Sequence, residues 1–241
     1  MACAPFVAAS SNEAIPIGKV IDISLELDPN TFKMHVLEGF QSDAQFELEV
    51  VKPYEGGLGQ IVRAVHMRLH AGSHVDAPAH MLREGKQIHE LPLERFIGDA
   101  LVVDFTDKVP GGHITPDDLQ ERIGAKVRPG DRLLIRTNVN KEYLGADIAA
   151  WKKRSPALTV DARLWCIEKG VSLVGFDCYH GAKVPGENRS SSHVLPKGEV
   201  LTLPYLNNLD RISKERVTLI CLPLNMINVE ASPVRAVVIE N

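Results

Sequence analysis

Residues 157–177 read ALTVDARLWCIEKGVSLVGFD, the pattern of a helix followed by a buried strand. Thr159 is a residue type that caps helix N-termini, and Gly170 is one that ends helices. The residues at helical spacing between them are Ala162, Trp165, Cys166 and Lys169. The apolar run at 172–177 is typical of a strand buried on both faces. This stretch therefore predicts a helix packed beside a central strand.

Short apolar or β-branched runs elsewhere in the chain predict further strands. They lie at 20–25, 61–69, 100–105, 132–137, 217–224 and 235–240. Another helix is predicted to open at Thr115, because Thr-Pro-Asp-Asp supplies a cap, a proline at the first helical position and an acid at the third. Strands outnumber helices in a mixed order, which indicates a mixed α/β (α+β) fold.

We expect one domain over residues 1–241, with a loose leader at 1–18 and a central, partly closed, barrel-like sheet flanked by helices. The irregular stretches at 26–60 and 178–200, rich in Gly, Pro, Ser and Asn, are predicted to be long loops. Long loops within a compact domain tend to be functional.

The composition excludes several classes of partner. A hydrophobic share of 44% suffices for a full core, and a net charge of -4 gives no basic field for nucleic acid. No stretch approaches the roughly 20 apolar residues of a membrane span. The four cysteines are scattered and form no CxxC pair: Cys3, Cys166, Cys178 and Cys221. We therefore expect a soluble protein of a reducing compartment, the cytoplasm, with no nucleic-acid or membrane partner.

The densest chemical signal is HAGSHVDAPAH at residues 70–80, with three histidines and one carboxylate in eleven positions. Zinc and manganese sites need imidazole nitrogens and a carboxylate oxygen that converge at about 2.0 to 2.2 Å from the ion. Gly72 allows a turn, and His74 and Asp76, two apart in extended backbone, point the same way. Pro78 fixes the exit direction and leaves His80 just beyond the ligands, where a histidine can move protons.

The alternative is that these histidines cap a strand and hydrogen-bond locally, which is the commoner role of a single histidine. The spacing of the whole segment favours a metal site instead. His66 and His70 are predicted to share a face of the strand at 61–69. His66 either enters the pocket or, more commonly for a strand histidine, is satisfied by a neighbour.

Residues 70–80 resemble the HxGTHxDxPxH signature of the cyclase family, which includes bacterial kynurenine formamidase and isatin hydrolase. Segments from about residue 20 onward are similar to the family pattern as well: IDISLEL, LPLERFIGDALVVDF, RPGDRLLIRT, ALTVDARLWCIEKGVSLVGFD and ASPVRAVVIE. The resemblance implies a cyclase-type swivelling β/α fold and a metal-dependent hydrolase.

The resemblance also implies roles for the residues of this segment. His70, His74 and Asp76 would hold one divalent ion, Mn²⁺ or Zn²⁺, and His80 would handle protons as general acid and base. Ser73 stands where the family usually has threonine, and it would contact a ligand or cap a turn.

The C-terminal half departs from the family pattern. His193 matches a histidine that the two-metal members use, and it is a second candidate for proton transfer or oxyanion binding. The glutamate that accompanies it is missing, because Pro204 stands near its place and Glu199 is not equivalent by spacing. We therefore expect one metal.

Substrate contacts are expected from two further segments. Asp177 and Tyr179 follow a buried strand, where loop residues often line a site. Cys178 between them is expected to be a buried, inert thiol. Phe40 lies in an N-terminal segment that, by the resemblance, reaches a neighbouring subunit's pocket, which implies a homodimer or homotetramer; alternatively it anchors its own loop.

Three functions fit these residues. The first is hydrolysis of a small cyclic amide, imide or lactone, or of an N-acyl bond. The second is a lyase or cyclase reaction through a metal-stabilised enolate. The third is a metal-binding protein without turnover. The sequence lacks GxSxG, GxxxxGK[ST] and a strand-linked GxGxxG, which argues against serine hydrolases and nucleotide-binding proteins. Its aromatic share of 5% argues against a pocket built around a large ring.

Overall fold

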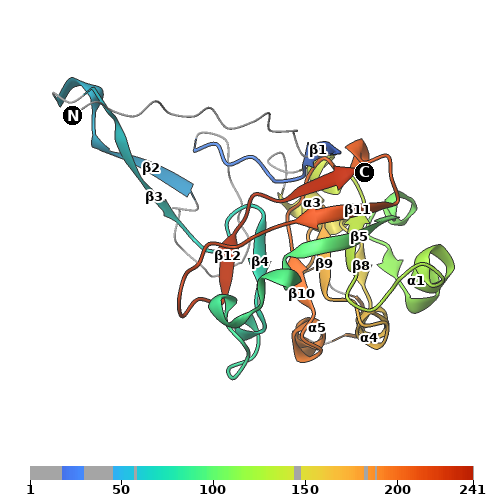
Figure 1. Ribbon diagram of the computed structural model, residues 1–241. Helices are drawn as coiled ribbons and strands as arrows, with labels where there is room; N and C mark the ends of the chain where they lie inside the picture. Colours follow the sequence, from blue (N-terminus) through green and yellow to red (C-terminus); the bar gives the residue numbers. More distant parts are fainter. Residues whose placement is uncertain are drawn as a thin grey trace, which may run out of the picture.

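The computed structural model describes residues 18–29, 46–56, 59–143, 148–181, 184–187 and 189–240. Its main element is a nine-stranded sheet in the order β1-β13-β11-β5-β7-β9-β10-β4-β12, which curls into a half-barrel (Figure 1). The strands are β1 (Lys19–Asp22), β4 (His74–Asp76), β5 (Ile97–Asp104), β7 (Arg132–Arg136), β9 (Leu173–Phe176), β10 (Leu201–Leu203), β11 (Arg216–Ile220), β12 (Ala231–Pro233) and β13 (Val237–Glu240).

The centre of this sheet is parallel and its flanks are antiparallel. Strands β5, β7, β9 and β10 run parallel to one another. Strands β11, β13 and β1 on one side, and β4 and β12 on the other, pair antiparallel. The predicted mixed fold with a partly closed central sheet is therefore confirmed.

Two small sheets accompany the main one. Strands β2 (Phe46–Lys52) and β3 (Val62–Met67) form an antiparallel ribbon that projects from the body, and β6 (His113–Ile114) pairs with β8 (Ala157–Leu158). Strand β2 lies within the stretch that the sequence predicted as a loop. Strand β3 ends at Met67, earlier than predicted, because the chain turns there and the backbone N–H of Ala71 donates to the carbonyl of Arg68.

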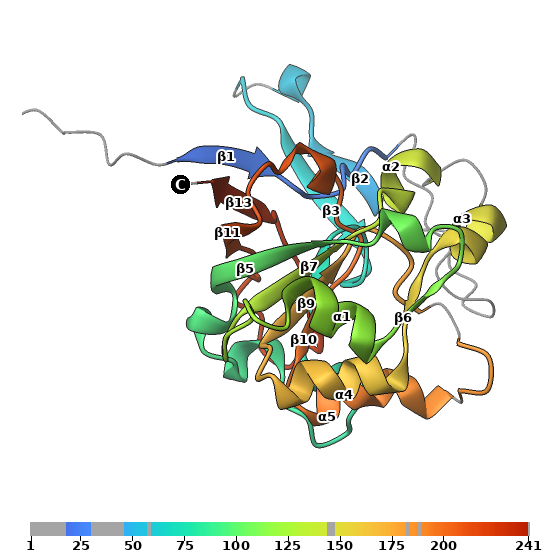
Figure 2. The same ribbon diagram turned by 90° about the vertical axis from the view of Figure 1, so that its right-hand side faces the viewer.

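Helices α1, α4 and α5 cover one face of the sheet, and α2 and α3 lie near one end of it (Figure 2). Their bounds are α1 (Pro116–Ile123), α2 (Val139–Tyr143), α3 (Ile148–Arg154), α4 (Val160–Glu168) and α5 (Val194–Lys197). Single 3₁₀ turns are η1 (Tyr54–Gly56), η2 (Pro78–His80), η3 (Ile88–Glu90), η4 (Leu93–Arg95), η5 (Thr106–Lys108), η6 (Arg189–His193) and η7 (Leu209–Arg211). None of the described helices is both long and apolar enough to cross a membrane.

The predicted caps explain where the two main helices begin. At α1, the Thr115 hydroxyl accepts from the N–H of Asp118, and the Asp118 carboxylate accepts from the N–H of Thr115, so two free N–H groups are satisfied. At α4, the Thr159 hydroxyl accepts from the N–H of Ala162. Gly170 follows α4 with φ 71°, a conformation in which glycine is unstrained.

The central strands are buried on both faces, as their apolar runs predict. Leu133 and Val174 pack into the core cluster beneath the helices, whereas Leu134 and Leu173, their neighbours in sequence, pack into the cluster inside the curl. Successive side chains of one strand thus serve two separate cores. This double burial fixes the sheet that carries the site.

Candidate metal centre

The segment at 70–80 folds so that its ligand side chains meet at the sheet. His74 and Asp76 lie on β4, which is bonded to β10 on one side and β12 on the other. Their side chains point the same way, while Val75 between them is buried in the core inside the curl. His70 lies in the turn that precedes β4 and does not lie on the strand predicted for it.

Three ligand atoms converge in this arrangement. His70 Nδ1 lies 2.9 Å from Asp76 Oδ1 and 3.2 Å from His74 Nε2, and His74 Nε2 lies 3.2 Å from Asp76 Oδ1. Atoms that each bind one ion at about 2.1 Å are about 3.0 to 3.4 Å apart at ordinary coordination angles. The triangle therefore has the size of one face of a Zn²⁺ or Mn²⁺ coordination sphere, and the donor set suits either ion.

Hydrogen bonds on the far side of His74 and Asp76 hold both in orientation. His74 Nδ1 donates to the carbonyl of Gly72 at 2.8 Å, which leaves Nε2 as the nitrogen that faces the other ligands. Thr202 on β10 donates its hydroxyl to Asp76 Oδ2 at 2.9 Å. Gly72 itself has φ 62°, as expected for the turn that its sequence predicts.

The charges of the group favour cation binding. Burial opposes ionisation of Asp76, but the charge of His74 and hydrogen bonds from His70 and His74 outweigh it, so the pKa of Asp76 lies well below its usual value. Burial lowers the pKa of His70, but the hydrogen bonds to Asp76 and Glu230 and the charges of these carboxylates outweigh burial, so the pKa of His70 is raised. An ion bound here would replace the positive charge of the histidines that the carboxylates now attract.

His80 lies beside the three ligands, at the end of the turn Pro78–His80. Its ring centroid is 4.3 Å from that of His70. Burial holds the pKa of His80 below its usual value, with smaller and opposing effects from the neighbouring charges. The structure thus brings His80 next to the three candidate ligands.

Glu230 is a site residue that the sequence analysis missed. Its Oε1 lies 3.1 Å from His70 Nε2, and its ligand atoms lie within 4.8 Å of those of His70 and His80. The signal available in the sequence was an acid directly before the segment ASPVRAVVIE. Nothing in the local pattern indicated that this acid faces residues 70–80.

Aromatic rings close the other side of the group, at the carboxyl ends of β9 and β10, although the chain is poor in aromatic residues. The Tyr205 ring contacts those of His74, His180 and Trp151 at centroid distances of 5.6, 5.7 and 5.8 Å. Tyr179 packs on Trp151 at 5.3 Å. Tyr179, His180 and Tyr205 thus lie beyond the carboxyl ends of β9 and β10, the region where ligands of open α/β sheets bind.

Two buried polar atoms in this wall have no hydrogen-bond partner among the described residues: Tyr205 Oη and His180 Nδ1. Burial raises the pKa of Tyr205 and lowers that of His180 to about 4, so both side chains are neutral near pH 7. Tyr205 also has φ 59°, a conformation that costs a non-glycine residue about 1 to 3 kcal/mol. Tyr205 was not among the residues that the sequence analysis singled out.

Ser73 ties the site to two other segments. Its hydroxyl donates to the carbonyl of Tyr205 at 2.7 Å and accepts from the N–H of Leu25 at 2.8 Å. The side chain is buried. Its hydroxyl therefore holds in place the backbone around the candidate ligands His70, His74 and Asp76.

Asp177 and His193, which the sequence also predicted as site residues, have other hydrogen-bond partners. The Asp177 carboxylate accepts from the N–H and hydroxyl of Thr137 and from the N–H of Asn138, so it fixes the turn before α2. Burial raises its pKa to about 6. His193 lies 3.5 Å from the Ser192 hydroxyl and belongs to neither ligand cluster found among the described residues. Phe40 lies outside the described residues.

Three further residues behave as the sequence suggested. His66 is exposed on the ribbon and is satisfied by Glu49, with Nε2 2.9 Å from the carboxylate. Cys178 is buried, as expected, and burial raises the pKa of its thiol far above the usual value. Glu199 pairs with Lys86 at 2.7 Å and takes no part in the ligand group.

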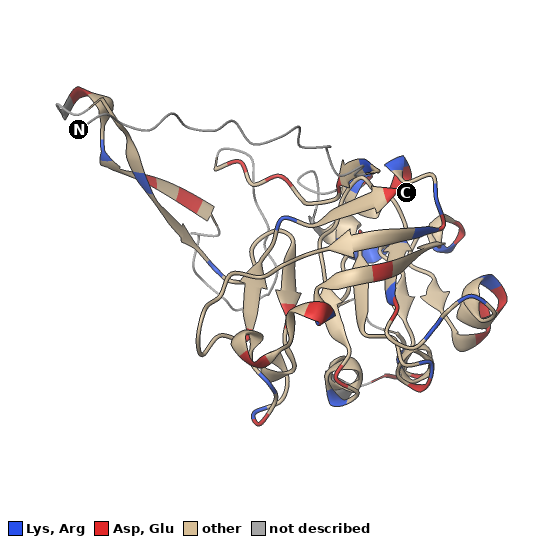
Figure 3. Ribbon diagram, in the orientation of Figure 1, with Lys and Arg blue, Asp and Glu red and all other residues tan. Residues whose placement is uncertain are grey.

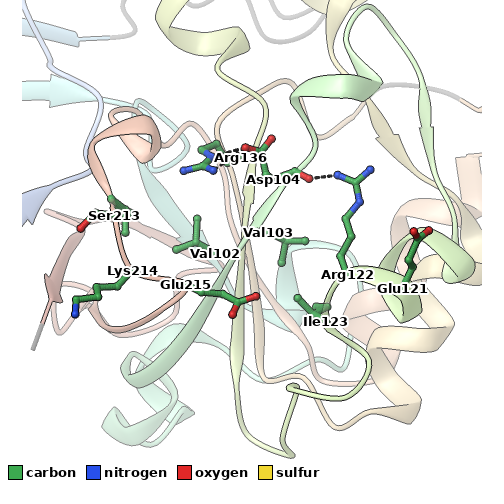
Figure 4. Close-up of a pocket in the computed structure, with 11 residues that line it drawn as sticks. Val102, Val103, Asp104, Glu121, Arg122, Ile123, Arg136, Ser213, Lys214 and Glu215 are labelled. Atoms are coloured by element: carbon green, nitrogen blue, oxygen red, sulfur yellow. Dashed lines mark hydrogen bonds and ion pairs between the residues drawn. The ribbon is translucent and has the colours of Figure 1, made fainter.

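A surface pocket of about 540 Å³ lies elsewhere, over β5, β7 and α1 (Figure 4). Its arginines are already paired: Arg136 binds the Asp104 carboxylate at 2.6 Å, and Arg122 binds the Asp104 carbonyl and the Asp107 carboxylate. The residues of the metal group do not line it. We therefore assign it no part in the chemistry.

Comparisons with known proteins agree with this geometry. The chain is 30% identical to a kynurenine formamidase of Salinibacter ruber over 174 residues, which are 72% of this chain and 77% of that protein. It is 27% identical to a kynurenine formamidase of Bacillus cereus over 90% of this chain and 96% of that one. Isatin hydrolase A from Labrenzia aggregata, bound to benzyl benzoate, shares the fold at a TM-score of 0.80 and 23% identity, over 92% and 93% of the two chains. Together with the match to the Cyclase family over residues 21–181, the first relative shows that this chain belongs to that family.

Proposed function

We propose that the protein is a metal-dependent hydrolase that cleaves the C–N or C–O bond of a small cyclic amide, imide or lactone, or of an N-acyl substrate such as an aryl formamide. The observation that carries this proposal is the triangle of ligand atoms from His70, His74 and Asp76, with His80 at its side. The kynurenine formamidase relatives support the substrate class.

One divalent ion, Mn²⁺ or Zn²⁺, would be held by His70, His74 and Asp76. When bound, such an ion supplies a water of lowered pKa and polarises the carbonyl under attack. His80 accepts the proton at a ring nitrogen, because its lowered pKa keeps the imidazole neutral near pH 7, and it returns the proton to the leaving nitrogen or oxygen. His193 is the second candidate for this role, since α5, which follows it, packs against the turn that carries His80.

The substrate would lie against the aromatic wall. Tyr205 Oη and His180 Nδ1 are buried, so a substrate oxygen or N–H that bonds to either must first open the contacts among the rings; it would then relieve the cost of about 1 to 3 kcal/mol of a buried polar atom without a partner. Tyr179 and Phe40 remain our proposed contacts from the sequence. Ser73 and Asp177 would act on the substrate through the backbone that their hydrogen bonds hold. Tyr205→Phe is expected to raise KM several-fold while leaving ion affinity unchanged.

We further propose that two or four copies assemble through the β2–β3 ribbon. A two-stranded ribbon is marginally stable alone, and this one exposes apolar side chains: Val51 is 59% exposed and Val65 is 52% exposed. A second copy of the chain would cover them as a homodimer or homotetramer. Light scattering of wild type should give a multiple of one chain mass, and Val65→Glu should shift it toward the monomer. A monomeric wild type would refute the assembly.

Two other expectations remain part of the proposal. In Figure 3, the positions of Lys and Arg are interspersed with those of Asp and Glu over the described part of the molecule, which supports a small-molecule substrate and no nucleic-acid partner. The three described cysteines are free and buried, which supports a reducing compartment, the cytoplasm.

The test of the hydrolase is a panel of isatin, aryl formamides, cyclic imides and small lactones, assayed with Mn²⁺- and Zn²⁺-loaded protein. Wild type and the control His113→Ala, a histidine outside the site, should turn over one substrate class, and His74→Ala should not. The products should carry one added water. Products of unchanged mass or with a water lost would indicate the lyase or cyclase reaction, and tight ion binding without turnover would indicate a metal-binding protein.

A further inference from the structure

His70 lies between two carboxylates. Its Nδ1 faces Asp76 Oδ1 at 2.9 Å, inside the ligand triangle, and its Nε2 faces Glu230 Oε1 at 3.1 Å, on the opposite side. Glu230 is held in place by its backbone, since its carbonyl accepts from the N–H of Ala77 at 2.9 Å and the next residue, Ala231, pairs with Asp76 in the sheet. The carboxylate therefore starts from a fixed point beside the ligands.

We propose that Glu230 is a positioning residue for the ion. Its carboxylate accepts the Nε2–H of His70, which keeps the proton on that nitrogen and leaves the lone pair of Nδ1 directed at the ion. This inference rests on the proposed function, because it takes the ion to sit at His70, His74 and Asp76.

The other two ligands have partners of the same kind. His74 is fixed by the carbonyl of Gly72, and Asp76 is fixed by the hydroxyl of Thr202. Histidine ligands of metals almost always donate their second N–H to a carbonyl or a carboxylate, which fixes the ring and makes the ligand nitrogen more basic. Glu230 supplies this partner for His70, and it is the one of the three partners that carries a charge.

The competing role for Glu230 is direct binding of a second ion together with His70 Nε2 and His80, whose ligand atoms also cluster. That arrangement requires both ring nitrogens of His70 to bind an ion at the same time. An imidazole with Nδ1 on an ion keeps its proton on Nε2, so only His80 and Glu230 would remain for the second ion. Two ligands make a weak site, and the positioning role is favoured.

The experiment measures Zn²⁺ affinity by competition with a fluorescent chelator, on metal-stripped full-length protein. Glu230→Ala is expected to weaken binding about 10- to 100-fold. Glu230→Gln is expected to recover part of the loss, because its side-chain oxygen still accepts the Nε2–H. The matched control is Glu84→Gln, an exposed carboxylate on the loop that follows His80, which should bind within about twofold of wild type. All variants should bind one ion per chain.

A ¹⁵N spectrum of the histidine rings separates positioning from a general loss of structure. In the ion-loaded wild type, Nε2 of His70 should carry the proton. In Glu230→Ala the ¹⁵N signal of this nitrogen should move or broaden, while the signals of the histidines outside the site stay unchanged. Unchanged affinity in a folded Glu230→Ala would overturn the proposal. So would two ions per chain in wild type and one in Glu230→Ala, which would make Glu230 a ligand. These outcomes do not depend on turnover, so the hydrolase can fail its own assay while this inference stands.

Discussion

Replacing Ser73 with alanine removes one hydroxyl that serves two backbone groups. The hydroxyl donates to the carbonyl of Tyr205 and accepts from the N–H of Leu25, at 2.7 and 2.8 Å. Alanine leaves both groups without that partner. It also frees the turn at Tyr205, whose left-handed backbone is held partly by this bond.

The size of the effect follows from burial. A buried polar group left without a partner costs about 1 to 3 kcal/mol. The Tyr205 carbonyl belongs to a buried residue and bears the larger share, while the N–H of half-buried Leu25 regains part of its loss from water. We therefore expect Ser73→Ala to lower the free energy of unfolding by about 2 to 4 kcal/mol. This raises the unfolding equilibrium constant about 30- to 700-fold.

Urea unfolding of the metal-stripped protein at one fixed chain concentration measures this difference. Ser73→Thr keeps the hydroxyl and is the matched control, expected to stay within about 1 kcal/mol of wild type. A Ser73→Ala protein as stable as wild type would refute the reasoning, because it would mean that the hydroxyl does not hold the two segments. Equal destabilisation by Ser73→Thr would show that volume, and not hydrogen bonding, is decisive at this position.

Three further changes test the surroundings of the site. Gly72→Ala places a Cβ 2.7 Å from Leu27 Cδ2 on backbone with φ 62°, which adds strain of about 1 to 2 kcal/mol. The substitution should therefore lower the melting temperature in a thermal scan. An unchanged melting temperature would contradict this. Thr202→Val removes the bond to Asp76 with little change in shape and should weaken Zn²⁺ binding about tenfold in a chelator competition. For Glu240, hydrogen bonds from the N–H groups of Ser213 and Lys214 lower the pKa from 4.5 to about 2. The stabilisation that the ionised Glu240 supplies is therefore present above about pH 4.5 and is lost as the pH falls toward 2. Glu240→Gln should flatten the pH dependence of the urea midpoint over that range. An unchanged slope would contradict this role of Glu240.

The parts of the fold that could be predicted are those with local signals. The helix caps at Thr115 and Thr159 act within three residues of themselves, and the apolar runs of the central strands record burial on both faces. Strand β2 was missed because its burial pattern shows no apolar core face, and its pairing with β3 supplies what the local sequence does not. His70 was misplaced for a related reason: the alternation continues past Met67, where the strand itself stops.

The site residues also divide into those with a local sequence signal and those without one. His74, Asp76 and His80 come from one short segment, so their spacing carried the prediction. Glu230 and Tyr205 lie more than a hundred residues away in sequence, and they reach the site through the order β10-β4-β12 and the pairing of Thr202 with Asp76. No local pattern encodes the neighbours of a three-residue strand, so these contributors became visible only in the folded chain.

The position of β4 between β10 and β12 bears on how an ion would enter. Two of the three proposed ligands, His74 and Asp76, lie on backbone that is hydrogen-bonded on both sides, and the third, His70, is bonded to Glu230. Backbone held in this way is ordered before anything binds, so association requires the loss of water from the ion and of a proton from His70, but no folding of a loop. Calorimetry should then find that the heat-capacity change on ion binding is small, in contrast to the large negative values of sites that order as they fill.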